Sequence, residues 1–207
     1  MKDYFKDFNE EELSLIKSLD TPHKIQSFIN SIPINFEESR ETCHSPKTVL
    51  RIRKAHCMEG AMLAACILRY HGYQPILMDI EATKDDFDHV VALFKIDGFY
   101  GAISKTNHSV LRYREPIYKS VRELALSFFH EYFTDSGIKT MRTYSNPVNL
   151  KQFDNKNWMT SDKDVWFIPN HLTEINHKPI LTKKQITSLR KADEIEIQAG
   201  KLVEYKK

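Results

Sequence analysis

Cys57 and His89 are the two residues whose types and positions could support covalent chemistry. Cys57 falls in the first turn of an apolar helix that we expect over residues 55–71. Unpaired backbone N–H groups and the helix dipole stabilise a negative charge there, so the pKa of this thiol should be lowered. His89 begins an apolar strand further along the chain, and imidazole exchanges protons near neutral pH. Together they predict a nucleophilic thiol served by an imidazole base.

A β-hairpin is predicted over residues 89–104, with the Asp-Gly pair at 97–98 as its turn. A two-residue turn at this point places Val91 opposite Ser104. His89 and Ser104 then project from the same face of the sheet as diagonal neighbours. This face is where a third group that orients the imidazole would stand.

Ser104 and Asn107 are the candidates for that third group. A serine hydroxyl can accept a hydrogen bond from imidazole but brings no charge to stabilise imidazolium. Asn107 lies just beyond the strand and is the alternative, since some thiol sites use an asparagine in this role. Asn107 could equally just end the strand.

Cys43 and Cys66 are expected to take no part in the chemistry. Cys66 lies near the opposite side of the helix from Cys57 at 3.6 residues per turn, so we interpret it as core. Cys43-His44 and His56-Cys57 invite a zinc interpretation, but their spacing fits no finger or ribbon, and a metal on Cys57 would quench the nucleophile. We expect neither a metal nor a cofactor.

The elements that must position these residues are helices around a short antiparallel sheet, which is an α+β fold. The longest apolar helix should be the buried centre of that fold. Gly, Pro and hydrophobic spacing place helices at about 10–18, 22–32, 55–71, 120–133 and 189–199, and strands at 74–80, 89–96 and 99–104. We expect one domain over residues 1–207.

Two segments resemble the transglutaminase-like domain family. HCMEGAMLAACILRYHGYQPILMDI resembles the block in which the catalytic Cys opens a helix that ends in a Leu-Arg-x-x-Gly type turn before an apolar strand. DHVVALFKIDGFYGAIS resembles the second block, and Cys57, His89 and Tyr100 fall at matching places. The family usually has Asp at the third position, where this chain has Ser104. The resemblance covers about residues 45–110.

The resemblance implies a papain-like, transglutaminase-like core at about 45–110, with a helical N-terminal extension and a C-terminal extension over about 111–207. It implies that Cys57 attacks a carboxamide or peptide carbonyl to give a thioester, which water or an amine resolves. The Cys57 backbone N–H would be one oxyanion donor. Tyr100, Arg112 and Arg114 are the expected substrate-binding residues, with a surface role as the alternative for the two arginines.

Composition restricts the partners and the compartment. A net charge of +2 gives no reason to expect nucleic acid, the acidic N-terminal segment has no apolar signal core, and no apolar run reaches the length of a membrane span. Three cysteines without a Cys-x-x-Cys motif suit free thiols in a reducing compartment. We therefore expect a cytoplasmic protein whose partner is a peptide or protein amide substrate.

A second hypothesis follows from Ser104. A chain that has lost the third charged group could be a catalytically weak or inactive scaffold that binds a partner protein or peptide through the same fold.

Overall fold

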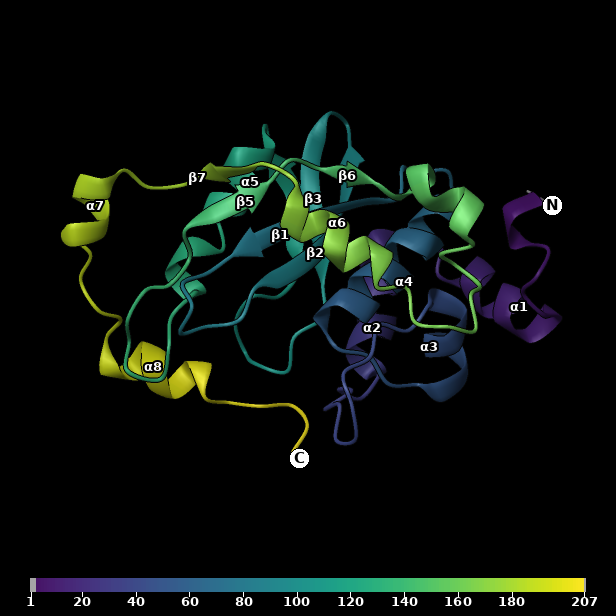
Figure 1. The fold of residues 1–207 in the computed structure, drawn as a ribbon, viewed down its shortest axis with the longest axis horizontal. Coiled ribbons are helices and arrows are strands. Elements are labelled where there is room, and N and C mark those ends of the chain that lie inside the picture. The colour runs from purple at the N-terminus through teal and green to yellow at the C-terminus, as the bar shows by residue number, and fades with distance from the viewer. Residues whose placement is uncertain (1–2, 207) are drawn as a thin grey trace.

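An antiparallel sheet of seven strands forms the centre of the structure, a computed structural model that describes residues 3–206 (Figure 1). Within these residues the strands are β1 (Ile76–Glu81), β2 (His89–Ile96), β3 (Phe99–Ser104), β4 (Arg114–Tyr118), β5 (Thr143–Ser145), β6 (Val148–Asn149) and β7 (His177–Pro179). Their order is β4-β3-β2-β1-β5-β7, and β6 also pairs with β1. Helices pack against this sheet, so the predicted α+β class is confirmed.

The hairpin of β2 and β3 has the predicted bounds and register. Val91 lies opposite Ser104, and the first residue after the turn, Phe99, lies opposite Ile96. The turn residues at 97–98 both have positive φ, which a type I′ hairpin turn requires and which an Asp-Gly pair adopts readily. The turn chemistry therefore fixes which side chains of β2 and β3 share a face.

Eight α-helices are present in the described part of the chain. They are α1 (Glu10–Ser18), α2 (Pro22–Ser31), α3 (Pro46–Ile52), α4 (Cys57–Tyr70), α5 (Val121–Leu126), α6 (Phe167–Glu174), α7 (Lys183–Thr187) and α8 (Glu194–Gly200). The side chains of Asn9, Thr21 and Ser45 accept hydrogen bonds from the first turns of α1, α2 and α3. No helix among residues 3–206 has the length and apolar character needed to cross a membrane.

Two predicted helices are shorter than expected. The helix expected over 120–133 ends at Leu126, because the Arg114 guanidinium bonds both the hydroxyl and the carbonyl of Ser127. A 3₁₀ turn at Phe129–Glu131 continues the chain. The helix expected over 189–199 begins only at Glu194, after a capping box closed by Asp193.

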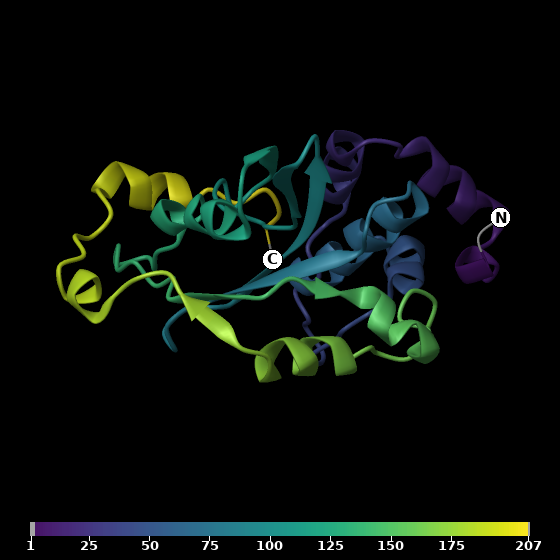
Figure 2. The same cartoon turned by 90° about the horizontal axis from the view of Figure 1, so that it is seen from above.

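The two faces of the sheet bury separate apolar clusters. Along β2, the even-numbered positions from Val90 to Phe94 belong to the cluster that contains α4, whereas Val91 and Leu93 belong to the cluster that contains α5. Every residue of α4 from Met58 to Arg69 is buried, as its apolar circumference predicts. Figure 2 shows α5 and α6 on opposite sides of the sheet.

The two ends of the elongated molecule are formed by opposite ends of the chain. Helix α1 lies at one end, and α7 and α8 lie at the other (Figure 1). After α8 the chain returns to the middle of the molecule, where the Tyr205 hydroxyl donates a hydrogen bond to the Asn30 carbonyl, 2.8 Å away. The last residues thereby join α2 to the C-terminal part of the chain.

Gly60 lets α4 approach the end of β3 closely. A Cβ atom at this position would lie 2.5 Å from the Cβ and 2.9 Å from the Cγ of Lys105. Lys105 cannot easily withdraw, because it is buried and its ammonium donates to the carbonyls of Ile29 and Ile32 at the end of α2. This close packing sets the distance between the start of α4 and the residues that end β3.

Gly60→Ala should therefore lower the free energy of unfolding by about 1–3 kcal/mol, the usual cost of overpacking a filled site. Helix propensity alone predicts the opposite, a gain of about 1 kcal/mol. Urea denaturation of the two proteins decides between these effects. A stabilised variant would show that α4 does not approach Lys105 this closely.

Candidate active site

Cys57 is the first residue of α4, and its half-buried side chain faces a cleft of about 770 Å³. His56 and His89 line the same cleft. The first backbone N–H groups of a helix have no partner within the helix, so the sulfur lies at the positive end of the helix dipole. The structure thus brings the predicted thiol and imidazole into one cavity.

His89 is held by Ser104 in the predicted diagonal arrangement. The Nε2 atom of His89 lies 2.7 Å from the Ser104 hydroxyl oxygen, and this hydroxyl donates its only hydrogen to the Leu111 carbonyl at 2.5 Å. The hydroxyl oxygen must therefore accept the Nε2–H of His89. This tautomer leaves Nδ1 as the ring nitrogen available to Cys57.

Gln26 of α2 fixes the backbone of Ser104. Its side-chain oxygen accepts from the Ser104 N–H at 2.9 Å, and its side-chain nitrogen donates to the Ser104 carbonyl at 2.8 Å. Gln26 is buried. Sequence analysis did not assign it a role, because nothing local signals that α2 lies against the end of β3.

The pKa of Cys57 falls to about 5 through contact with two histidines. Burial raises this pKa. Hydrogen bonding to the His56 and His89 rings and the positive charges of both rings lower it by more than burial raises it. For His56, burial lowers the pKa, whereas the hydrogen bond to Cys57 and the charge of Glu59 raise it to about 9. At neutral pH this arrangement favours a thiolate beside an imidazolium.

Glu59 is a fully buried carboxylate surrounded by hydrogen-bond donors. It stands in the first turn of α4 and accepts from the backbone N–H of His56 at 3.1 Å. Its other donors lie between α2 and α4: the Thr42 hydroxyl at 2.9 Å, the His44 backbone N–H at 2.9 Å and the Asn35 amide at 3.1 Å. Burial raises its pKa, but His56 and these hydrogen bonds hold it below its ordinary value.

His56 and Glu59 are functional candidates that sequence analysis missed. Their spacing, with Glu59 in the third helical position, was visible as a capping box, in which a Glu reaches back to the residue before the helix. His56 entered only the zinc interpretation. Among the described residues, no group of three or more His, Cys, Asp or Glu side chains could hold a metal ion.

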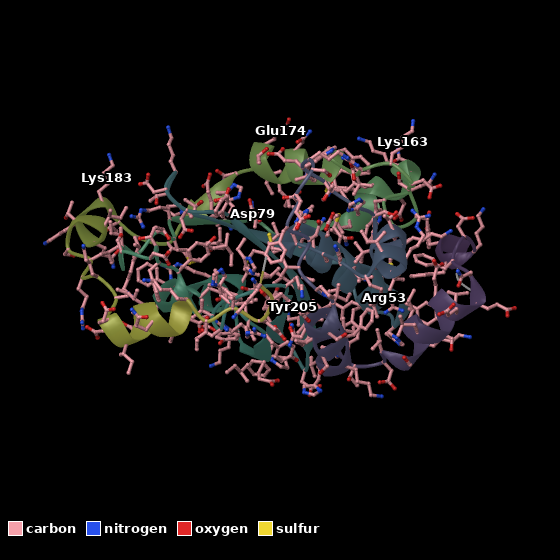
Figure 3. All side chains as sticks on the ribbon, turned by 90° about the horizontal axis from the view of Figure 1, so that it is seen from below. Arg53, Asp79, Lys163, Glu174, Lys183 and Tyr205 are labelled. Atoms are coloured by element: carbon pink, nitrogen blue, oxygen red, sulfur yellow. The ribbon has the colours of Figure 1, made fainter. Side chains whose placement is uncertain are left out.

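A second buried carboxylate, Asp79 on β1, lies on the sheet near the middle of the molecule (Figure 3). One oxygen is 3.2 Å from Nε2 of His177, and the other has no hydrogen-bond partner in the part of the chain that the structure describes. Burial, reinforced by the charges of Asp88 and Cys57, raises its pKa to about 6 despite His177. This acid links β7 to β1.

Asn107 makes no hydrogen bond with His89 in the described part of the chain, so the structure does not place it in its predicted alternative role. Its amide nitrogen donates to the Tyr205 carbonyl at 2.9 Å, and its amide oxygen accepts from the Tyr205 N–H at 2.8 Å. Tyr205 lies in the C-terminal segment that crosses the middle of the molecule (Figure 3). Asn107 therefore anchors the C-terminal segment at the rim of the cleft.

Tyr100, Arg112 and Arg114 do not line the cleft, so the structure does not support their expected role in substrate binding. Arg112 pairs with Glu204 at 3.0 Å, and Lys95 stacks its ammonium over the Tyr100 ring, 4.5 Å from the centroid. These contacts belong to the C-terminal segment and to the exposed end of the hairpin.

Arg114 also has a structural role. Its guanidinium contacts the Glu131 carboxylate at 2.6 Å and lies over the Phe128 ring, 4.1 Å from the centroid. The Glu131 carboxylate in turn accepts from the Leu111 N–H at 2.8 Å. The Leu111 carbonyl also accepts a hydrogen bond from the Ser104 hydroxyl. Arg114 therefore supports Ser104 indirectly, through Glu131 and Leu111.

Cys43 and Cys66 are buried, and all three cysteines are free. Burial raises the pKa of both thiols. Cys66 is a core residue as predicted, and Cys43 is equally enclosed. Only Cys57 combines access to a cleft with a lowered thiol pKa.

The rim of the cleft next to His89 is acidic and carries one prominent aromatic ring. Residues 85–88 line it, and the Phe87 side chain is 89% exposed. The Tyr132 hydroxyl donates to the Phe87 carbonyl, which fixes the backbone of this loop. An exposed ring beside a thiol offers an apolar surface to an extended ligand.

A comparison with curated proteins finds no match. A family model described as a transglutaminase-like domain matches residues 10–114, about half of the chain. The matched region begins at α1 and extends through β3, so it contains Cys57, His89 and Ser104 as well as the helices that hold them. The chain belongs to the transglutaminase-like domain family.

Proposed function

We propose that the chain is a thiol enzyme that breaks an amide bond of a peptide or protein and passes the acyl group to water or to an amine. The observation that carries the proposal is the Cys57 sulfur at the start of α4, which shares one cleft with the His56 and His89 rings that lower its pKa. We also propose a reducing compartment, because the three cysteines are free.

In the first half-reaction, the Cys57 thiolate attacks the carbonyl carbon and a carbon–sulfur bond forms. The Cys57 backbone N–H at the helix start supplies one hydrogen bond to the oxyanion. Protonated His89 gives its Nδ1 proton to the leaving nitrogen as the carbon–nitrogen bond breaks. The products of this step are a thioester at Cys57 and a free amine.

In the second half-reaction, neutral His89 takes a proton at Nδ1 from water or from an acceptor amine, which attacks the thioester. The carbon–sulfur bond breaks, and the Cys57 thiolate returns. Ser104 keeps the His89 ring oriented through both steps by accepting the Nε2–H.

The hydroxyl at position 104 suits this role in a way that an Asp would not. It accepts from His89 and donates to the Leu111 carbonyl, whereas a carboxylate could only accept and would face that carbonyl without a proton. Ser104→Asp is therefore a poor restoration of the family's usual acid. Ser104→Asn retains both a donor and an acceptor and is the better conservative variant.

The second candidate function is a scaffold that binds a partner and has lost catalysis. The neutral Ser104 hydroxyl behind His89 favours it, because no charge there stabilises imidazolium. A folded protein whose Cys57 has an ordinary pKa and forms no thioester would have this function.

The reactivity of Cys57 should rise with pH through an inflection near pH 5, because the thiolate is the reactive form and the pKa of Cys57 is about 5. Iodoacetamide labelling at a series of pH values, with each cysteine followed by peptide mass, measures this. The inflection is the decisive quantity, since a thiolate of low pKa is intrinsically less nucleophilic. Buried Cys43 and Cys66 are the internal controls. An inflection at the ordinary value of about 8.5 would contradict the proposal.

His89→Gln should allow acylation of Cys57 by p-nitrophenyl acetate but slow deacylation by about 10²–10⁴-fold. The nitrophenolate leaving group needs no proton, whereas the attacking water must lose one. Stopped-flow absorbance gives the acylation burst, and intact mass gives the lifetime of the acyl-enzyme. Cys57→Ala should show no burst, and Cys66→Ala should retain it. Unchanged deacylation in His89→Gln would exclude His89 as the base.

A further inference from the structure

We infer that His56 is the lasting counter-ion of the Cys57 thiolate, that buried Glu59 keeps His56 charged, and that His89 is thereby left to move the protons. This inference deepens the proposed function and rests on it. It assigns different roles to two histidines that face the same sulfur.

The first support is the environment of Glu59. Its side chain is completely buried, and its contacts are almost all donors that match an ionised carboxylate. His44 adds its Nδ1 atom at 2.6 Å, at the edge of the cluster that faces Asp164. A buried carboxylate needs hydrogen bonds and an opposite charge to remain ionised, and His56 is placed to supply that charge.

The second support is the set of atoms around the His56 ring. Its Nε2 lies 3.0 Å from the Thr42 carbonyl oxygen, which can only accept, so Nε2 carries a hydrogen. The same nitrogen is 3.5 Å from a Glu59 oxygen and 3.8 Å from a Glu37 oxygen. Because Nε2 donates its hydrogen to the Thr42 carbonyl, Nδ1 is the ring nitrogen that can donate to Cys57. Two carboxylates on one side and the sulfur on the other all favour imidazolium.

The third support is the contrast with His89. Its Nε2 is bound to the neutral hydroxyl of Ser104, which cannot stabilise a positive charge as a carboxylate does. The charged group that the family places behind the histidine of β2 is therefore present in this chain behind a different histidine. Glu59 stands behind His56 at the start of α4.

The different roles of His56 and His89 affect both half-reactions. When Cys57 becomes a thioester, its negative charge disappears and His56 loses one of the groups that keep it protonated. Glu59 and Glu37 remain, so His56 stays charged through both half-reactions and is ready to stabilise the thiolate when it returns. The Nε2 atom of His89 bonds a hydroxyl and not a carboxylate, so in this inference His89 is the ring that passes the proton in every cycle.

The test compares His56→Gln, Glu59→Gln and His89→Gln in the full chain, with the iodoacetamide inflection of Cys57 as the readout. Loss of an adjacent imidazolium should raise the Cys57 inflection by about 1–3 pH units in His56→Gln. His89→Gln should raise it by less. His56→Arg retains the charge and should bring back part of the low inflection that His56→Gln loses.

Glu59→Gln should also raise the inflection, provided that circular dichroism and thermal unfolding show a folded protein. His56→Gln keeps the inference testable if Glu59→Gln does not fold, because His56 lies at the cleft and Gln can still donate to Thr42. A larger shift in His89→Gln than in His56→Gln would overturn the inference and leave the proposed function standing. An ordinary inflection in the unmodified protein would instead overturn the proposed function.

Discussion

Burial of the Cys57 sulfur makes a negative charge costly, and the start of α4 with two imidazole rings offsets that cost. The rest of the site follows from this balance. The helix supplies unpaired N–H groups, β2 supplies His89, and the residue before the helix supplies His56. The contribution of His89 depends on α4 lying close against the end of the hairpin, which the absence of a side chain at Gly60 allows.

Glu59 connects this electrostatic balance to the fold. The same carboxylate closes the first turn of α4 and collects donors from the segment between α2 and α4. A buried charge of this kind gives little net stability but is strongly destabilising when its partners are removed. We therefore interpret Glu59 as the group that keeps His56 in position beside Cys57.

Much of the fold could be predicted where local chemistry decides the structure. The Asp-Gly turn fixed the bounds and register of β2 and β3, and the apolar circumference of residues 58–69 identified the central helix. Helix α3 was not predicted, although Ser45 and Pro46 are ordinary helix start signals. The strands from β4 to β7 have two to five residues each, too few for an alternating pattern to appear.

The candidate site, too, could be predicted only where its residues lie in sequence blocks with defined spacing. Cys57, His89 and Ser104 lie in two sequence blocks with defined spacing, and the structure brings them together. Contacts between distant segments could not be predicted: Asn107 bonds Tyr205 near the end of the chain, and Gln26 of α2 bonds Ser104. The spacing of His56 and Glu59 could be recognised in the sequence as a capping box, but a capping box usually indicates only where a helix begins.

The most direct measurement of the central claim is a nitrogen-15 NMR titration of the histidine rings in the unmodified protein and in Cys57→Ser. At neutral pH His56 should have both ring nitrogens protonated, because its pKa is raised to about 9, and Cys57→Ser should lower that pKa by removing the thiolate. A neutral His56 ring that does not respond to the loss of the sulfur would contradict a thiolate–imidazolium pair at the start of α4.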